Sequence, residues 1–368
     1  MSRTVSACLL ALLLAASCMR TEHNGKETID LVVSIAGNPE SPDRLMLESL
    51  SKVPANGDIY ILGSPRTCGL IGESFLANDS FDNVRARLFS DGLKDFAGET
   101  FALVEDAEFS PYSEFVELNG GDALRELSVR LALSSLRDKC NASIYDIEGN
   151  EAKARAKMLI LADPWMLNGG KFDIDTLFSL TSCRVPVISP QELLIEAAFA
   201  GEKKYFNVGM MCDSAYVGTG VYHSIYEAGA AKYDIMGTRY FEAASSGDEG
   251  HRLAAFLNRY SESGKDEPLD VLLVDDWSVD KEALMQELAL IRDYTREEFM
   301  RYGKMISPDF TIFSSAELTM HYCYRKLRAL SLFTHRIAFP DMRVYTIKPQ
   351  PGGSKLQFLL IPSENVQG

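Results

Sequence analysis

The sequence predicts an α/β protein of two lobes, each a parallel sheet flanked by helices. Apolar, β-rich runs alternate with segments of helical spacing along most of the chain. Such alternation favours parallel sheets whose two faces are covered. The alternation occurs on both sides of a polar break at residues 201–204, and 368 residues suit about two domains. We therefore predict two sheets rather than one.

In the first half, β-rich runs predict strands, and apolar residues at helical spacing predict the helices between them. The run at residues 58–62 is closed by Gly63-Ser64-Pro65, which marks a strand end. The strongest helical pattern lies at residues 123–139, where four leucines share one side. The predicted strands span residues 29–36, 58–62, 101–104, 154–162 and 185–189. The predicted helices span residues 41–52, 81–96, 123–139 and 191–200.

The second half repeats this rhythm and ends in a hairpin. The hairpin is predicted from two β-rich runs, residues 344–348 and 356–361, around Pro351-Gly352-Gly353. The other predicted strands span residues 205–211, 239–243, 270–274 and 310–313. The predicted helices span residues 220–232, 251–260, 279–294 and 316–332. We expect residues 28–200 with 338–368 to form the first lobe, and residues 201–337 to form the second.

The N-terminus resembles a bacterial lipoprotein signal. One arginine, Arg3, precedes an apolar run at residues 7–16, which is shorter than the ~20 residues that span a bilayer. Residues 14–18 resemble a lipobox, and this implies cleavage before Cys18 and a palmitate-type lipid anchor on its sulfur. We expect residues 1–17 to be a signal peptide and 18–27 a tether. The expected location is the cell envelope, with the protein anchored in the outer membrane and facing the periplasm.

Composition and missing motifs argue against several classes of protein, binding partner and site. Hydrophobic residues make up 46% and charged residues 24%, which are globular values. The net charge of -15 argues against a nucleic-acid partner, and against docking on anionic lipid by charge alone. The sequence contains no Walker motif, no GxSxG motif and no Cys/His pair at metal-ligand spacing. We expect no cofactor, no metal and no nucleic acid.

Five cysteines remain after residue 18, and an odd number cannot all pair within one chain. Several lie in or beside apolar runs, so we expect buried free thiols, with one disulfide as the alternative. These cysteines are Cys68, Cys140, Cys183, Cys212 and Cys323.

Candidate ligand-binding residues follow from the predicted strand ends. In open parallel sheets, ligands bind beyond the carboxyl ends of the strands. Both tryptophans closely follow an aspartate there, and a ring beside a carboxylate suits a sugar or nucleoside. The alternative is that both rings fill gaps between sheet and helix. The candidates are Asn38, Arg66, Asp163, Trp165, Ser214, Tyr216, Asp276, Trp277 and Ser314. No catalytic residue is predicted.

Several stretches resemble type I periplasmic binding proteins. They are residues 208–214, residues 218–222, and Asp309–Ser315 with the following helix and residues 337–340. The resemblance implies two α/β lobes that close around a ligand by hinge motion. The expected function is capture of a small polar solute for a permease or sensor, without chemistry, so we expect a protein that is not an enzyme.

Residues 208–222 also resemble a stretch in aspartate/glutamate racemases, which use two cysteines as opposed acid and base. Cys68 and Cys212 could take these roles, but the family follows its cysteines with Asn-Thr and Thr-His. Here Gly69-Leu70 and Asp213-Ser214 follow instead. The open alternatives are therefore a racemase-like enzyme, a hydrolase or lyase that uses aspartates 163, 275 or 276, and an assembly lipoprotein with a degenerate cleft.

Overall fold

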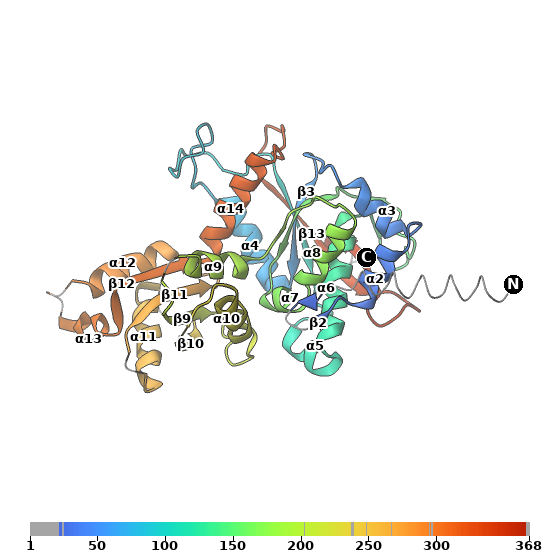
Figure 1. Ribbon diagram of the computed structural model, residues 1–368. Coiled ribbons are helices and arrows are strands. Elements are labelled where there is room, and N and C mark those ends of the chain that lie inside the picture. The colour runs from blue at the N-terminus through green and yellow to red at the C-terminus, as the bar shows by residue number, and fades with distance from the viewer. Residues whose placement is uncertain are drawn as a thin grey trace. The chain divides into compact units, whose positions relative to one another are not determined.

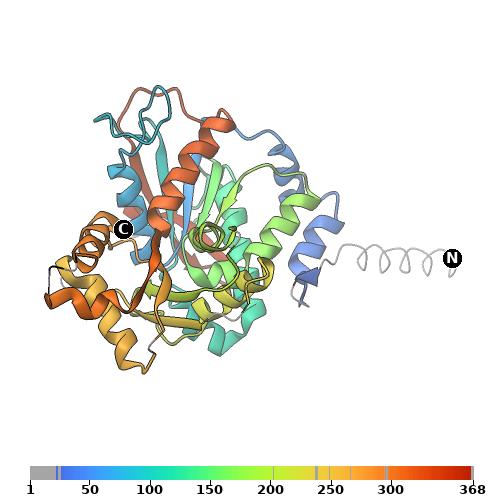
Figure 2. The same cartoon turned by 60° about the vertical axis from the view of Figure 1, so that its left-hand side comes forward.

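The computed structural model describes residues 22–23, 26–201, 203–236, 239–247, 249–265, 267–293, 295 and 297–365. The chain divides into two compact units (Figures 1 and 2). Unit 1 comprises the described part of Met1–Gly72, together with Phe81–Ile188 and Leu327–Gly368; unit 2 comprises Glu73–Ser80 and Ser189–Lys326. The predicted signal peptide and lipidation site, residues 1–17 and Cys18, lie outside the described residues.

The predicted fold class is confirmed: parallel sheets are flanked by helices. Unit 1 contains a six-stranded sheet of order β14-β13-β4-β3-β7-β8. Only β14 runs antiparallel within it, paired with β13. The strands are β3 (Asp58–Gly63), β4 (Thr100–Glu105), β7 (Ala156–Leu161), β8 (Val187–Ile188), β13 (Asp341–Pro349) and β14 (Phe358–Pro362). Short strands β1 (Glu22–His23) and β2 (Lys26–Glu27) pair with each other, as do β5 (Lys139–Cys140) and β6 (Glu151–Ala152).

The helices of unit 1 cover this sheet with apolar faces. On α6 the predicted stripe of Leu124, Leu127, Leu131 and Leu136 is fully buried. Helices α2, α3, α6 and α8 pack against one another on one side of the sheet (Figure 1). The helices are α2 (Asp30–Gly37), α3 (Pro42–Ser49), α5 (Tyr112–Asn119), α6 (Gly121–Leu136), α7 (Pro164–Gly169), α8 (Lys171–Leu180) and the short η3 (Ser363–Asn365). Helices α4 (Pro65–Ala77) and α14 (Ser315–Ala329) contain residues of both units.

Unit 2 contains a four-stranded parallel sheet of order β10-β9-β11-β12. Its core fills the space between β11, α11 and α12 with large side chains such as Phe256, Tyr260 and Leu288. The strands are β9 (Asn207–Cys212), β10 (Arg239–Ala244), β11 (Leu269–Asp275) and β12 (Ile306–Ser314). The helices are α9 (Pro190–Phe199), α10 (Val221–Lys232), η1 (Glu249–His251), α11 (Arg252–Glu262), α12 (Lys281–Ile291), η2 (Glu297–Phe299) and α13 (Met300–Gly303).

Most predicted elements are confirmed to within a few residues, including the closing hairpin of β13 and β14. Two are wrong. The predicted strand at residues 29–36 is helix α2, because a short apolar run fits a helix that buries only one face, here Val32, Ile35 and Ala36. The predicted helix at residues 81–96 is a loop, closed by a bridge between Phe81 and Leu88.

Five α-helices were missed: α4, α5, α7, α8 and the short α13. Helix α4 contains Gly69 and Gly72, and glycines lower helix propensity, so the sequence reads as a continued turn. At Gly72 a side chain would meet Leu103 and Met342, which explains why glycine stands there. Across the described ranges, no helix combines the length and hydropathy needed to cross a membrane.

Candidate active site

The order of the second sheet marks one place for a ligand. From β9 the chain forms β10 on one side and then β11 on the other, so the strand order reverses between β9 and β11. In open α/β sheets, ligands bind at such a switch point, beyond the carboxyl ends of the strands. The register places Asp275, the last residue of β11, beside Cys212, the last residue of β9. Asp275 therefore lies at the position where this sheet topology predicts a ligand.

The Asp275 carboxyl group accepts three side-chain hydrogen bonds. Its Oδ2 accepts from the Tyr222 hydroxyl at 2.7 Å and from Gln191 Nε2 at 2.9 Å. Its Oδ1 accepts from Ser315 Oγ at 2.5 Å. The three donors lie in the first turns of α10, α9 and α14. Three helix beginnings thus converge on one carboxyl group.

Every donor to Asp275 is neutral, and the whole network is buried. Asp275 is 6% exposed, and Tyr222, Gln191 and Ser315 are each at most 2% exposed. Within the described ranges, no lysine, arginine or histidine pairs with Asp275. Burial raises the pKa of Asp275, the three hydrogen bonds oppose this, and the charge of Asp276 adds to it. The protonated form is therefore more accessible than in an ordinary aspartate.

Gln191 is itself held in one orientation. Ser189 Oγ lies 2.9 Å from Gln191 Oε1, and Ser189 caps α9 by accepting from the backbone N–H of Glu192. With its oxygen turned to Ser189, the Gln191 amide presents its NH2 group to Asp275. Ser189 therefore has two roles at the start of α9. It caps the helix, and it orients the Gln191 amide so that its NH2 group donates to Asp275.

Asp276 is bound to its own turn. It accepts from Ser278 N at 2.8 Å, from Ser278 Oγ at 2.7 Å, and from the Ser245 hydroxyl just after β10. The cap of α12 is Asp280, so Asp276 does not cap that helix. Asp276 instead fixes the backbone that follows Asp275.

The thiols are poorly suited to acid–base work in this structure. The five described cysteines are free and buried, which confirms the expectation. Burial raises the pKa of Cys212, and nearby carboxylates such as Glu242 and Asp275 raise it further. Burial also raises the pKa of Cys68, whose Sγ donates toward the carbonyl oxygens of Ile61 and Val104. Both groups are held as neutral thiols.

The carboxyl edge of the first sheet also carries aspartates, but they serve the local backbone. Asp163 caps α7 and accepts from Trp165 N at 3.0 Å. Asp106 accepts from the backbone N–H groups of residues 108 and 109 and from the Tyr112 hydroxyl. Burial raises the pKa of Asp106 to about 6.

The predicted ligand-binding residues fall in several environments. Asn38 was chosen as a strand end, but it is exposed at the end of helix α2, where its side chain accepts from Glu40 N. Arg66 and Ser214 are exposed, whereas Ser314 is buried at the end of β12. Tyr216 packs edge-on against Tyr222, so it lies beside the Asp275 network.

The two tryptophans predicted to bind ligand pack against other side chains instead. Trp165 lies against the core of unit 1, and Trp277 stacks on Phe75 with ring centroids 6.2 Å apart. The indole nitrogens of both are buried without an acceptor in the described part of the chain. Their positions agree with the gap-filling alternative.

No member of the network is among the nine ligand-binding candidates. Asp275 was named only for the hydrolase or lyase alternative, and its three donors, Gln191, Tyr222 and Ser315, were not candidates at all. Each stands at the first or second position of a helix that follows a strand. A polar side chain at such a position is the signal that could have found them, because helix beginnings point toward the carboxyl edge of the sheet.

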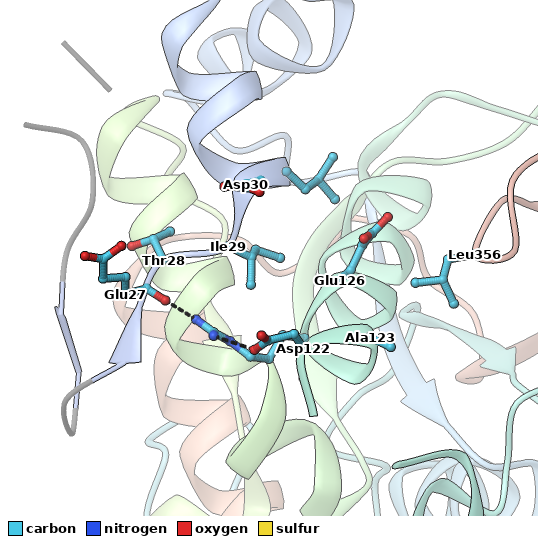
Figure 3. A pocket seen from close by; sticks show the side chains of 10 residues that line it. Glu27, Thr28, Ile29, Asp30, Asp122, Ala123, Glu126 and Leu356 are labelled. Carbon is cyan, nitrogen blue, oxygen red and sulfur yellow. Dashed lines mark hydrogen bonds and ion pairs between the residues drawn. The ribbon is translucent and has the colours of Figure 1, made fainter. Parts of the chain in front are cut away.

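The structure also contains a cavity of about 640 Å³ in unit 1 (Figure 3). It is lined by residues 27–31, by the beginning of α6 and by Leu356. Its arginine, Arg125, is fully engaged: it pairs with Asp173 at 2.7 Å and Asp122 at 2.9 Å, and donates to the carbonyl oxygen of Glu27. This ion pair fixes the chain entering α2. In the part of the chain that is described, no cluster of three potential metal ligands occurs.

Comparison with known proteins gives a fold-level answer. Neither a protein-family model nor a curated protein matches the sequence. Glutamate racemase from Thermus thermophilus matches with a TM-score of 0.45 and 13% identity, over 82% of this chain and 92% of that one. The Francisella tularensis glutamate racemase gives a TM-score of 0.47 and 13% identity, over 80% and 89%. A solute-binding protein of an ABC transporter from Burkholderia graminis gives 0.26 and 8%, over 84% and 96%.

These matches correct the predicted function. The sequence analysis predicts a solute-binding protein that does no chemistry and is not an enzyme. The racemases, which are enzymes, match with higher TM-scores than the solute-binding protein does. The matches thus stand against the solute-binding prediction, which is not pursued, and the racemase-like alternative is taken up below as a proposal.

Proposed function

We propose that the protein is an enzyme that moves a proton on a small polar substrate by general acid–base catalysis, with racemase-like chemistry carried by Asp275. The observation that carries this proposal is the Asp275 carboxyl group, buried at the switch point of the second sheet and held by three neutral donors. Carboxyl groups with raised pKa values at such positions are typical of acid–base sites.

The network gives each residue a role. A carboxylate offers about four acceptor positions, and three are filled, so one is left for a substrate proton. Asp275 is the proposed catalytic residue, while Tyr222, Gln191 and Ser315 are positioning residues that fix its plane. Burial raises the pKa of Asp275 and no described cation holds it ionised, so its carboxyl group is suited to act as acid as well as base.

Carboxyl chemistry is favoured over thiol chemistry here. Cys212 lies beside Asp275, but burial and the surrounding acids keep its thiol protonated. The stretch that resembles racemases, residues 208–222, ends at Tyr222, which donates to Asp275. Acidic amino acids are therefore the first substrates to try, followed by neutral amino acids and 2-hydroxy acids.

The test is proton exchange at carbon. The full chain is incubated in D2O with each compound, and loss of the Cα proton signal is followed by NMR. We expect exchange with wild type and with Asp309→Asn, a control at an exposed aspartate of the same unit. Asp275→Asn should be slower by ~10²–10⁴-fold, the usual contribution of a general acid or base. Equal exchange in Asp275→Asn, or no exchange with any compound, contradicts the proposal.

We propose further that the chain is anchored in the cell envelope by lipid on Cys18. The support is the lipobox-like stretch at residues 14–18 after a short apolar run. Labelled palmitate supplied to expressing cells should enter wild type and not Cys18→Ala. Equal labelling of the two forms would place the lipid elsewhere.

A further inference from the structure

Two loops of unit 1 carry large apolar side chains that point away from the protein. They are the loop at residues 82–94, between Phe81 and β4, and the segment at residues 330–340, between α14 and β13. We call their exposed residues the apolar–basic surface. Its apolar members, with their exposed fractions, are Val84 (79%), Leu88 (58%), Phe89 (69%), Leu93 (62%), Ile337 (106%) and Phe339 (86%).

The two loops lie side by side although about 240 residues separate them. Arg328 Nη2 donates to the carbonyl oxygen of Val84 at 3.0 Å, and Gly98 N donates to that of Ala338 at 2.7 Å. Gly98 has a φ of +79°, and a side chain there would lie 2.2 Å from the carbonyl oxygen of Arg336. Glycine is thus required where the loops meet, and both Figure 1 and Figure 2 show them together at one end of unit 1.

Buried groups hold both loops in place. The first is closed by Phe81 and Phe96, which are fully buried, and by Asp95, whose two oxygens accept from Phe81 N. The second is held by the buried ion pair of Lys157 and Glu99, 2.5 Å apart. Lys157 donates to the carbonyl oxygen of residue 332, and Glu99 accepts from the N–H of residue 334. The exposed side chains therefore project from an ordered base.

The charge of this surface is opposite to that of the chain. The whole protein has a net charge of -15. Residues 82–94 and 330–340 together hold four basic residues, Arg85, Arg87, Lys94 and Arg336, and two acidic ones, Asp82 and Asp91; Arg328, at the end of α14, adds a fifth positive charge beside them. The local excess of positive charge sits among the apolar side chains rather than apart from them.

We propose that the apolar–basic surface docks on an anionic lipid bilayer, with its apolar side chains in the interface and its arginines and lysine at the headgroups. Apolar side chains flanked by Lys and Arg are the pattern of interfacial membrane binding. Each basic residue near an anionic leaflet contributes attraction, and this local charge complements lipid where the net charge would repel it. This proposal does not depend on lipidation of Cys18 or on the proposed role of Asp275.

Another loop of unit 1, outside the apolar–basic surface, provides a control for the role of charge. The loop at residues 141–150 also exposes apolar side chains, Ile144, Tyr145 and Ile147. Its charged residues are all acidic, Asp146 and Glu148. It exposes apolar side chains beside charges of the opposite sign, so it should stay off an anionic bilayer.

The test uses an added indole as a probe of depth. The full chain with Phe89→Trp is mixed with vesicles of phosphatidylcholine and phosphatidylglycerol whose acyl chains carry bromine, which quenches nearby indole emission. The control is Tyr145→Trp, an aromatic position in the acidic loop that is more exposed than Phe89. We expect quenching beyond wild type for Phe89→Trp and not for Tyr145→Trp. Adding Arg85→Glu and Arg87→Glu should weaken vesicle binding at least about tenfold.

Three results would overturn the proposal. The first is no extra quenching with Phe89→Trp. The second is equal quenching in phosphatidylcholine alone that the two Arg→Glu changes leave intact, because the charge then plays no part. The third is an emission change that grows with protein concentration without vesicles, which would make a second copy of the chain the occupant. None of these outcomes depends on catalytic activity.

Discussion

The carboxyl edges of the two sheets hold their aspartates in different ways. In unit 1, Asp106 and Asp163 accept from backbone N–H groups two or three residues away and so shape local turns. In unit 2, Asp275 accepts only from side chains, on residues 84, 53 and 40 positions away. Both edges are buried, so burial alone does not separate them.

The type of hydrogen-bond donor, backbone or side chain, indicates the role of each carboxyl group. A carboxylate that caps its own turn is explained by the stability of the fold. Asp275 caps nothing, and three helices bring donors to it instead. Substitutions at the two edges should therefore have different effects on turnover and stability.

The first prediction compares Asp275→Asn with Asp106→Asn. Both changes are isosteric and remove one buried carboxyl group at a strand end. We expect Asp275→Asn to lower turnover ~10²–10⁴-fold and Asp106→Asn to leave it within about threefold. Turnover is read by the proton-exchange assay, with circular dichroism confirming the fold. Similar losses in both variants would mean that the two edges do not differ in function.

The second prediction concerns pH and stability. The pKa of Asp106 is raised to about 6, so the folded protein binds a proton that the unfolded chain releases near its ordinary pKa of 3.8. Stability from this group is therefore present at low pH and is lost as pH rises through about 6, by ~3 kcal/mol in total. Denaturant unfolding from about pH 4 to about pH 7 should show this decline in wild type and not in Asp106→Asn. The same decline in Asp106→Asn would assign it to another group.

The third prediction removes one donor from Asp275. Tyr222→Phe deletes a hydrogen bond that stabilises the charged carboxylate, so the pKa of Asp275 should rise further. The acid limb of the pH–rate profile should move up by about one unit, with a stability loss of ~1–2 kcal/mol. The control is Tyr226→Phe, one turn along α10, whose buried hydroxyl has no partner in the described part of the chain. An unmoved acid limb in Tyr222→Phe would remove Asp275 from the rate profile.

The smallest effect is expected at the cap of α7. Asp163→Ala should cost ~1 kcal/mol of stability, as loss of an N-cap does, with turnover unchanged. Asp280→Ala, at the cap of α12, is the matched control. A turnover loss with Asp163→Ala alone would bring the first edge into the reaction and end the contrast.

Sequence patterns predicted the sheets well because buried strands read as apolar runs. Residues 58–62, 154–162 and 270–274 became β3, β7 and β11, whose side chains are buried on both faces. Asp275 itself could be found as a strand-end residue. The residues that donate to Asp275 could not be found in this way. They lie 40 to 84 positions from it, and no periodic pattern in the sequence links residues so far apart.

Where the prediction failed, local spacing fitted more than one structure. Residues 29–36 suit a buried strand or a one-faced helix, and packing against α8 decided for the helix. At residues 81–96 the apolar spacing of Phe81, Val84 and Leu88 suits a helix. There Asp82 accepts from the N–H groups of residues 84 and 85 and folds the chain into a turn.

Strand β13 also has a consequence for biosynthesis. It pairs with β4, whose residues are made about 240 positions earlier. Until β13 emerges, the edge of β4 has no neighbour on that side, and an open apolar strand edge invites pairing with other chains. A ribosome making this chain therefore completes the first sheet only after about 240 further residues have followed β4. Its nascent form is the state most in need of a chaperone.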